Sequence, residues 1–343
     1  MGQRYRDAGV DISEATRAVE MIARAAATTA TPGVIGGIGG FGGLFRFDPT
    51  THPDPVLVAS TDGVGTKLKL AIALDRYDTI GVDVVNHCIN DIAVCGADPL
   101  FFLDYLAVGR LRAEVAAEIV SGMANACAAA GVALVGGETA ELPDLYGADD
   151  FDLAGFIVGV AARADLIDGA GVRPEDALIG LPSSGLHTNG FSLARRVFAE
   201  DDWRRSAPGL ESTIGDELLV PHRSYLDEIR ILRRTLRAEG SDLLALAHIT
   251  GGGWVDNIPR TLPAGLGVHV EPGSWQVPLI FSLIQKRGDI EDAEMVRTFN
   301  LGVGLTVVVR PELVDVVCAA VPGARRVGTV IRHEPGSARV SFG

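Results

Sequence analysis

A helix with polar residues on one side and apolar residues elsewhere constrains this chain more than any other feature. The polar positions recur at intervals of three and four, which stacks them into one stripe on an α-helix: Asp83, Asn86, His87, Asn90 and Asp91. The other faces carry Val, Ile, Cys and Ala side chains that require a core. Because a buried polar stripe is costly unless something charged lies against it, we expect a metal-bound phosphate here. The stripe therefore predicts an enzyme that uses ATP.

Two polar segments with an acidic residue flank this helix along the chain. Thr61-Asp62-Gly63-Val64-Gly65-Thr66-Lys67 follows a predicted strand at 56–60, and Gly136-Gly137-Glu138-Thr139 follows another at 132–135. We interpret both as loops at strand ends, where functional residues concentrate. Carboxylates are ligands that Mg²⁺ prefers, so Asp62, Asp91 and Glu138 predict ATP bound through Mg²⁺ rather than a histidine-rich transition-metal site. Lys67 is the expected point charge for the phosphates.

Length, charge and cysteine usage bound the class of protein. A chain of 343 residues predicts two domains, and a net charge of −14 argues against a nucleic-acid partner. No apolar run approaches the ~20 residues that span a bilayer, and no secretory signal is evident. Reduced thiols are expected rather than a disulfide or a zinc site, because no CxxC pair occurs among Cys88, Cys95, Cys127 and Cys318. We expect a cytoplasmic protein.

A glycine-dominated segment runs from Pro32 to Gly43. Gly37, Gly39 and Gly42 satisfy a formal GxGxxG, but a dinucleotide fingerprint must leave a strand and open a helix. Here residues 44–47 alternate like a strand instead. We therefore predict a flap whose backbone amides close over phosphates, and the alternative is a plain surface loop.

Periodicity predicts the other elements of the first half. Helices are expected at 1–30, 78–95 and 113–130, and strands at 100–108 and 151–160. The apolar side of the first helix comprises Ile12, Val19, Ile22 and Ala26. The pattern restarts near residues 168–171, which predicts domains at 1–168 and 169–343.

The second half opens with a strand at 177–181, a polar loop and a helix at 191–199. Hydrogen-bonding side chains at a helix start are typical of an anion site, and a plain connection is the alternative. The loop holds Ser183, Ser184, His187 and Asn189. A helix is also expected at 254–260 and a strand at 305–309, whereas residues 201–215 look irregular.

Two of the seven histidines are candidates for chemistry. His187 lies in a loop without periodic apolar neighbours, and it is therefore the preferred general acid–base group. For His87 a structural role is at least as plausible as a catalytic one. Surface or packing roles are expected for the others: His52, His222, His248, His269 and His333.

The chain lacks P-loop, protein-kinase and GxSxG motifs, but an ordered series of other motifs resembles one family, the phosphoribosylformylglycinamidine cyclo-ligases of purine biosynthesis. The resemblance runs from about Tyr5 to near Val340. The motifs that carry it are Asp7-Ala8-Gly9-Val10-Asp11-Ile12, Gly39-Gly40-Phe41-Gly42-Gly43, Thr61 to Lys67, Asn90-Asp91, Gly136 to Pro143, Ser183 to Gly190, Thr250 to Gly253, and Arg297-Thr298-Phe299-Asn300.

The resemblance implies a two-domain α/β protein. Residues 1–168 would bind ATP and dimerise, with a four-stranded sheet that pairs across a homodimer into a β-barrel, and residues 169–343 would form an α/β domain that completes the active-site cleft. The implied reaction converts formylglycinamidine ribonucleotide and ATP into aminoimidazole ribonucleotide, ADP and phosphate through an iminophosphate. No nucleic-acid or membrane partner is expected.

The resemblance also implies roles for individual residues. Catalysis would fall to His187, Lys67, Asp62 and Asp91. Nucleotide contacts would come from Gly37, Gly39, Gly40, Phe41, Gly42, Asp62, Gly63, Lys67, Asn90, Asp91, Gly137, Glu138 and Thr139. Substrate contacts would come from Ser183, Ser184, His187, Asn189, Gly251, Gly252 and Asn300. The chain departs from many family members at Thr188 and Phe191, where Ser and Tyr are common. It also departs from them in the first helix, where it has Ala23 and Arg24 and many members carry a lysine.

Two other classes of function compete with this interpretation. A sister ATP enzyme, such as thiamine-monophosphate kinase or selenophosphate synthetase, would share acids at similar positions. The synthetase should carry a reactive cysteine near its N-terminus, whereas the first cysteine here is Cys88. A non-catalytic binding protein on the same scaffold should have lost its acids, and all three are present.

Overall fold

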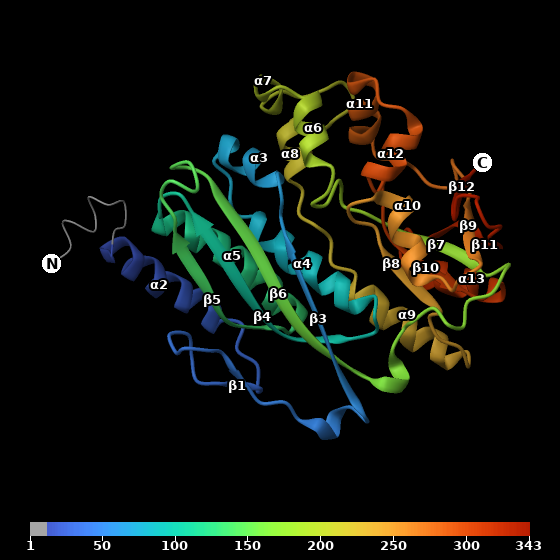
Figure 1. Cartoon of the computed structure of the whole chain (residues 1–343), viewed down its shortest axis with the longest axis horizontal. Coiled ribbons are helices and arrows are strands. Elements are labelled where there is room, and N and C mark those ends of the chain that lie inside the picture. Colours follow the sequence, from blue (N-terminus) through green and yellow to red (C-terminus); the bar gives the residue numbers. More distant parts are fainter. Residues whose placement is uncertain (1–11) are drawn as a thin grey trace. The chain divides into compact units, whose positions relative to one another are not determined.

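The computed structural model describes residues Ile12–Gly343, which divide into two compact units (Figure 1). The first comprises the described residues up to Ile92 together with Ala97–Ala164, and the second comprises Ala93–Gly96 together with Asp165–Gly343. The start of the predicted first helix and the motif from Asp7 to Asp11 lie outside the described residues. Both units combine helices with a sheet, which confirms the mixed α/β class.

The first unit is built on a four-stranded sheet with the order β3-β6-β4-β5. Its strands are β3 (Pro55–Gly63), β4 (Asp98–Val108), β5 (Ala133–Glu141) and β6 (Phe151–Ala162). β6 runs antiparallel to both β3 and β4, whereas β4 and β5 are parallel. β3 and β5 are therefore the two edges of the sheet.

Helices α4 (Ile80–Ala93) and α5 (Ala113–Ala130) cover one face of this sheet, whereas part of the other face is exposed. α4 and α5 approach closely at Gly81, where a Cβ would lie 2.0 Å from the Ile119 carbonyl oxygen. α5 ends at Gly131 in the left-handed conformation, a common helix terminator. On the open face, Leu57, Phe156 and Tyr105 are 63%, 42% and 37% exposed. The sheet thus presents large apolar and aromatic side chains on its exposed face.

The two acidic segments are strand rather than loop, which corrects the sequence-based prediction. β3 includes Asp62 and Gly63, and β5 continues through Glu138 to Glu141. A short helix, α3 (Lys67–Leu74), follows β3 and was not predicted. The strand extensions lack the usual hydrophobic alternation because glycine and polar residues occupy successive positions in both. Backbone pairing with β6 and β4 extends them nevertheless.

The N-terminal helix α2 (Ile12–Ala27) packs through small residues. Ala18 and Ala26 are buried, whereas Ile12 and Val19 are 58% and 52% exposed, so the predicted apolar side is only partly the packed side. Glu14 accepts a hydrogen bond from the Ala113 N–H at the start of α5 (2.8 Å). The glycine segment that follows is the tip of a hairpin between β1 (Val34–Ile35) and β2 (Leu44–Phe45).

The second unit contains a six-stranded sheet with the order β12-β9-β11-β7-β10-β8. All neighbours are antiparallel except β12 and β9. The strands are β7 (Ala177–Pro182), β8 (Ala245–His248), β9 (Leu266–Val270), β10 (Val303–Val309), β11 (Arg325–Arg332) and β12 (Val340–Phe342). The ends of β7 and β8 and the start of β10 meet at one end of the sheet, which brings the loops that follow or precede them together.

Short helices surround this sheet. They are α6 (Phe191–Val197), α7 (Glu200–Trp203), α8 (Ile214–Leu219), α9 (Leu226–Ala238), α10 (Gly253–Asn257), α11 (Leu279–Gly288), α12 (Asp292–Thr298) and α13 (Val314–Ala320). Single 3₁₀ turns occur at Pro49–Thr51, Arg163–Asp165, Ile258–Thr261 and Pro311–Leu313. The stretch predicted to be irregular thus contains α7 and the start of α8. Within Ile12–Gly343, no helix combines the length and the apolar character needed to cross a membrane.

Candidate active site

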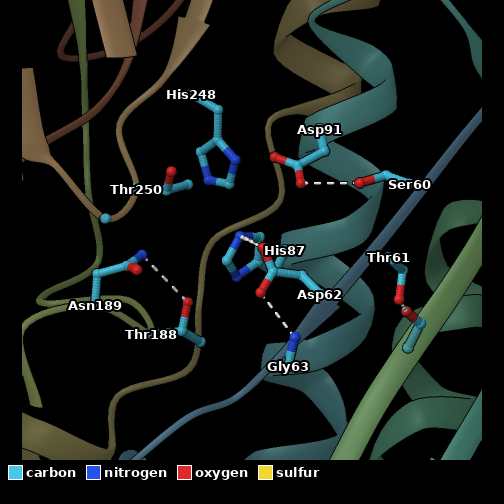
Figure 2. Close-up of polar contacts among 12 residues, drawn as sticks. Ser60, Thr61, Asp62, Gly63, His87, Asp91, Thr188, Asn189, His248 and Thr250 are labelled. Carbon is cyan, nitrogen blue, oxygen red and sulfur yellow. Dashed lines mark hydrogen bonds and ion pairs between the residues drawn. The ribbon is translucent and has the colours of Figure 1, made fainter. Parts of the chain in front are cut away.

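In the first unit, Asp62 lies on the side of β3 that faces α4, and Asp91 lies on α4 itself (Figure 2). Asp62 sits near the end of β3, where its Oδ1 accepts the Gly63 N–H (2.7 Å) and its Oδ2 lies 2.9 Å from His87 Nε2. Asp91, in the last turn of α4, accepts a hydrogen bond from the Ser60 hydroxyl (3.1 Å). The Asp62 side chain remains 41% exposed. Gly63 and His87 therefore orient the Asp62 carboxylate, which remains accessible to a ligand.

His87 is the buried member of this group, with 2% of its surface exposed. Burial alone would lower its pKa, but the hydrogen bond to Asp62 and the charges of Asp62, Asp91 and Asp83 together raise the pKa above its usual value. These carboxylates favour the protonated imidazole, whose positive charge offsets the negative charge around Asp62.

Lys67 does not lie in the position predicted for a phosphate contact. Its side chain is fully buried and its Nζ lies 2.9 and 2.8 Å from the two carboxylate oxygens of Asp83, which is also fully buried. Burial lowers the pKa of Lys67, and the neighbouring Asp83 opposes that shift. In this structure the ammonium group therefore faces Asp83 rather than an open site. Asp83, at the start of the polar stripe, is instead satisfied by an internal ion pair.

Glu138 is not brought together with Asp62 and Asp91 within one chain. It lies on β5, at the opposite edge of the sheet from Asp62 on β3. The register aligns Asp62 with Gly155, Gly155 with Asp104, and Asp104 with Gly137, so the two edges are roughly 14 Å apart at the usual strand spacing. Glu138 also pairs with Tyr105 on the open face, away from α4. One subunit therefore cannot place all three carboxylates on one ion.

The predicted glycine flap and Glu138 line a second site in the first unit, separate from Asp62 and Asp91. A cavity of about 660 Å³ is bounded by the flap, by α2 and by the open side of β4 and β5. Its lining includes most of the remaining predicted nucleotide residues: Gly37, Gly39, Gly40, Phe41, Gly42, Gly137, Glu138 and Thr139. Apart from Lys67, the predicted nucleotide residues thus form two groups. One lines this cavity near β5, and the other lies near β3 and comprises Asp62, Gly63, Asn90 and Asp91.

Asp104 belongs to the cavity group, although the sequence did not single it out. It is 8% exposed and it lines the cavity from β4. Burial raises the pKa of Asp104 to about 7, and the nearby Glu138 charge adds to the shift. A Cβ on Gly137 would lie 2.1 Å from Asp104 Oδ1, so glycine at this position leaves the space that the carboxyl group occupies.

In the second unit, the predicted substrate residues gather where β7, β8 and β10 meet. Ser183 donates to the Gly185 carbonyl (2.9 Å) and contacts Asn300 Oδ1 (3.1 Å), and the Asn300 amide also donates to Gly185 (2.8 Å). Asn300 is 3% exposed, so it holds the loop rather than facing solvent. Asn189 lies beside Gly251, since a Cβ there would approach its Oδ1 to 3.4 Å. Gly252 adopts φ +90°, which favours glycine.

His187 is buried, with 1% of its surface exposed, and its backbone has a left-handed φ of 63°. Its Nε2 accepts the Ser184 N–H (3.3 Å). Because a backbone N–H can only donate, the imidazole proton then resides on Nδ1. The Ser184 hydroxyl donates to the Pro221 carbonyl (2.6 Å). His187 thus sits beneath the loop in one defined tautomer instead of projecting from it.

Two further histidines, for which surface or packing roles were expected, lie buried in this cluster. His222 and His248 are 1% and 6% exposed, and their Nε2 atoms are 2.9 Å apart. The His222 ring stacks on His187 with centroids 4.0 Å apart. Sequence reasoning missed them because their partners come from distant segments. The only signal was the position of His248 two residues before the Thr250-Gly251-Gly252-Gly253 run.

Comparison with known proteins decides the family. Residues 43–161 match the model of the AIR synthase related protein N-terminal domain, and residues 173–341 match that of the C-terminal domain. A phosphoribosylformylglycinamidine cyclo-ligase of Desulfitobacterium hafniense is 52% identical over 92% of both chains. One of Thermoanaerobacter pseudethanolicus is 48% identical over 97% of this chain and 98% of the other. This chain belongs to the phosphoribosylformylglycinamidine cyclo-ligase family.

Solved structures of other proteins share the family's fold. Thiamine-monophosphate kinase from Stenotrophomonas maltophilia superimposes with a TM-score of 0.67 and 17% identity, covering 93% of this chain and 94% of the other. The hydrogenase maturation protein HypE in complex with ATP gives 0.64 and 19%, covering 92% and 88%. Identities this low show the fold alone, and they do not favour a kinase over the ligase family.

Proposed function

We propose that this chain catalyses the ATP-dependent ring closure of formylglycinamidine ribonucleotide to aminoimidazole ribonucleotide in purine biosynthesis, in the cytoplasm. One observation carries the proposal: relatives that bear the cyclo-ligase name are 46–52% identical over more than nine-tenths of both chains. The intact set of acids, Asp62, Asp91 and Glu138, supports catalysis over a purely structural role.

The chemistry requires an oxygen to leave a carbon atom at neutral pH. An amide oxygen is a poor leaving group, so the γ-phosphoryl group of ATP is transferred to it, which releases ADP and forms an iminophosphate. A neighbouring amidine nitrogen then attacks the activated carbon, the new C–N bond closes the ring, and the C–O bond breaks as phosphate leaves. Phosphoryl transfer depends mainly on positioning and charge neutralisation.

The residues around Asp62 suit a divalent cation. Mg²⁺ prefers carboxylate oxygens, and Asp62 and Asp91 offer such oxygens, each oriented by a hydrogen bond from Gly63 or Ser60. We assign Mg²⁺ to Asp62 and Asp91, with Asn90 beside them. When bound, the ion neutralises phosphate charge during transfer. His87 keeps the Asp62 carboxylate in place through its 2.9 Å contact.

We propose that a homodimer completes the nucleotide site. β3 and β5 are open edges, and the sheet face between them is apolar and exposed at Leu57, Phe156 and Tyr105. Pairing β3 of one subunit with β5 of another closes the sheets into a barrel, which removes both edges and buries that face. It also brings Glu138 and the flap of one subunit towards Asp62 of the other. The two groups of nucleotide residues then serve one ATP molecule.

The flap and the loop at 183–190 take the remaining roles. No atom lies within 4 Å of a Cβ built at Gly37, Gly39 or Gly42, so the flap has room to close over the nucleotide and exclude water from the activated intermediate. In the second unit, Ser184 and Asn189 with Gly251 and Gly252 bind the ribonucleotide. His187, with its proton on Nδ1, remains the proposed proton-transfer group.

The test is a direct assay of the purified protein with the amidine substrate, ATP and MgCl₂, in which aminoimidazole ribonucleotide is detected by diazotisation and ADP by a coupled assay. We expect the two products in equal amounts. Absence of the aminoimidazole product together with phosphorylation of thiamine monophosphate would replace the ligase by the kinase. Omission of ATP is the control.

A further inference from the structure

Three buried imidazoles from different segments meet beneath the predicted substrate loop. His187 lies in the loop after β7, His222 lies between α8 and α9, and His248 ends β8. The sheet fixes His248, because the neighbouring Leu305 of β10 pairs with it. The cluster therefore joins a loop to a rigid strand through one residue of an irregular segment, His222.

His222 uses both ring nitrogens and one ring face. Its Nε2 lies 2.9 Å from His248 Nε2, and its Nδ1 lies 3.4 Å from the Thr188 hydroxyl. Its face stacks on His187 with an interplanar angle of 18°. The Thr188 oxygen in turn accepts a hydrogen bond from the Asn189 amide at 3.5 Å (Figure 2). His222 thus touches two consecutive residues of the loop and, through Thr188, a third.

The loop needs such a support because its backbone is strained. A non-glycine residue with φ near +60° costs about 1–2 kcal/mol, and His187 has φ 63°. β10 leaves room for the His187 ring, since a Cβ at Gly304 would lie 2.4 Å from its Cε1. A site that tolerates strain of this kind requires neighbours that enforce one conformation.

A metal ion explains the three imidazoles less well. The nitrogen lone pairs of an imidazole lie in the ring plane, so two stacked rings direct them nearly parallel. The rings of His187 and His222, 4.0 Å apart and 18° from parallel, cannot both point at one ion. The contact between the two Nε2 atoms is that of a hydrogen bond in which one nitrogen donates and the other accepts.

We propose that His222 is a positioning residue that fixes the loop at 183–190 for the ribonucleotide substrate. It holds the His187 ring by stacking and the Thr188 hydroxyl by a hydrogen bond, and His248 anchors it to the sheet. The proposal rests on the proposed function. Loss of His222 should therefore weaken binding of the ribonucleotide substrate and leave ATP binding unchanged, because the predicted ATP contacts all lie in the first unit.

Three substitutions separate the interactions of His222. His222→Phe keeps only the stack, His222→Asn places an amide oxygen near the position of Nδ1, and His222→Gln extends an amide towards His248. We expect His222→Phe to raise the KM for the amidine substrate about tenfold, to leave the KM for ATP within about twofold, and to weaken substrate binding similarly in calorimetry without ATP. His222→Asn should recover part of the loss because it still accepts from Thr188.

The matched control is His269→Phe, which removes a histidine of β9 in the same unit that contacts Ser341 (3.1 Å), and it should leave both KM values unchanged. Thermal midpoints identify a variant that does not fold. If His222→Asn and His222→Phe bind substrate as wild type does, or if both KM values rise equally in folded variants, the positioning role is wrong. Stoichiometric Zn²⁺ binding that is lost in His222→Phe would replace it by a metal site. An inactive wild type would refute the function instead.

Discussion

Replacing Asp104 by Asn should make stability less dependent on pH. The buried Asp104 carboxyl has a pKa of about 7 in the folded chain, against about 3.9 in an unfolded chain. Between these values the unfolded chain ionises while the folded chain keeps its proton. The folded state therefore binds more protons, and this group lowers the free energy of unfolding as pH rises. The loss is complete above the folded pKa.

The magnitude follows from the shift. About three pKa units correspond to about 4 kcal/mol at full effect, of which roughly a third is already lost at pH 5. The asparagine side chain that replaces the carboxyl group has a similar shape and no charge to bury. Relative to wild type, Asp104→Asn should thus gain roughly 2–3 kcal/mol in free energy of unfolding between pH 5 and pH 8.

Urea denaturation at both pH values, at one protein concentration and with EDTA present, measures this difference. Asp152→Asn is the matched control, because Asp152 lies on the exposed side of the neighbouring strand β6 and loses the same charge. A gain for Asp104→Asn that stays constant between pH 5 and pH 8, or that the control reproduces, would refute the argument from burial.

Three further substitutions test other parts of the molecule. Asp91→Asn should lower kcat by orders of magnitude while circular dichroism and the thermal midpoint stay unchanged, because the amide cannot replace a carboxylate on Mg²⁺. His187→Ala should lower kcat for ring closure more than it changes the KM for ATP, and steady-state kinetics with each substrate varied will separate the two. Lys67→Met should cost about 3–5 kcal/mol of stability in urea denaturation, because it leaves the Asp83 carboxylate buried and unpaired. The double variant with Asp83→Leu should recover much of that loss.

Local patterns predicted most of the secondary structure because burial there follows the periodicity. α5 begins and ends at the predicted residues, with Gly131 as its terminator. The ends of β3 and β5 were missed because the glycines at 63, 136 and 137 and the polar residues beside them remove the hydrophobic alternation. α3 was missed because it follows β3 after a turn of three residues, Val64 to Thr66.

The polar stripe on α4 shows why a candidate site can be only partly read from a sequence. The spacing correctly predicted one polar side, but it could not separate internal partners from ligands. Asp83 is neutralised by Lys67, whereas His87 and Asp91 face Asp62 and Ser60 on β3. That division depends on α3, which carries Lys67 into the core. The same limit hid His222 and His248, whose partners lie far away in the sequence.

A subunit-mixing experiment tests whether Glu138 acts across the proposed dimer. Asp91→Asn and Glu138→Gln should each abolish activity in a homodimer. If every nucleotide site takes Asp91 from one subunit and Glu138 from the other, a mixed dimer holds one site with both defects and one with none. Random exchange makes half of the dimers mixed, so activity should return to about a quarter of wild type.

The control is a mixture of Asp91→Asn with Asp62→Asn, two residues on the same side of one sheet. Each site of that mixed dimer keeps a defect, so no activity should return. Recovery by the first mixture alone would locate Glu138 in the opposite subunit, as we propose from the roughly 14 Å between the edges β3 and β5. No recovery in either mixture, with exchange verified by a tagged subunit, would mean that Glu138 serves its own subunit. The sheet edges would then have to be bridged by the nucleotide rather than by a partner.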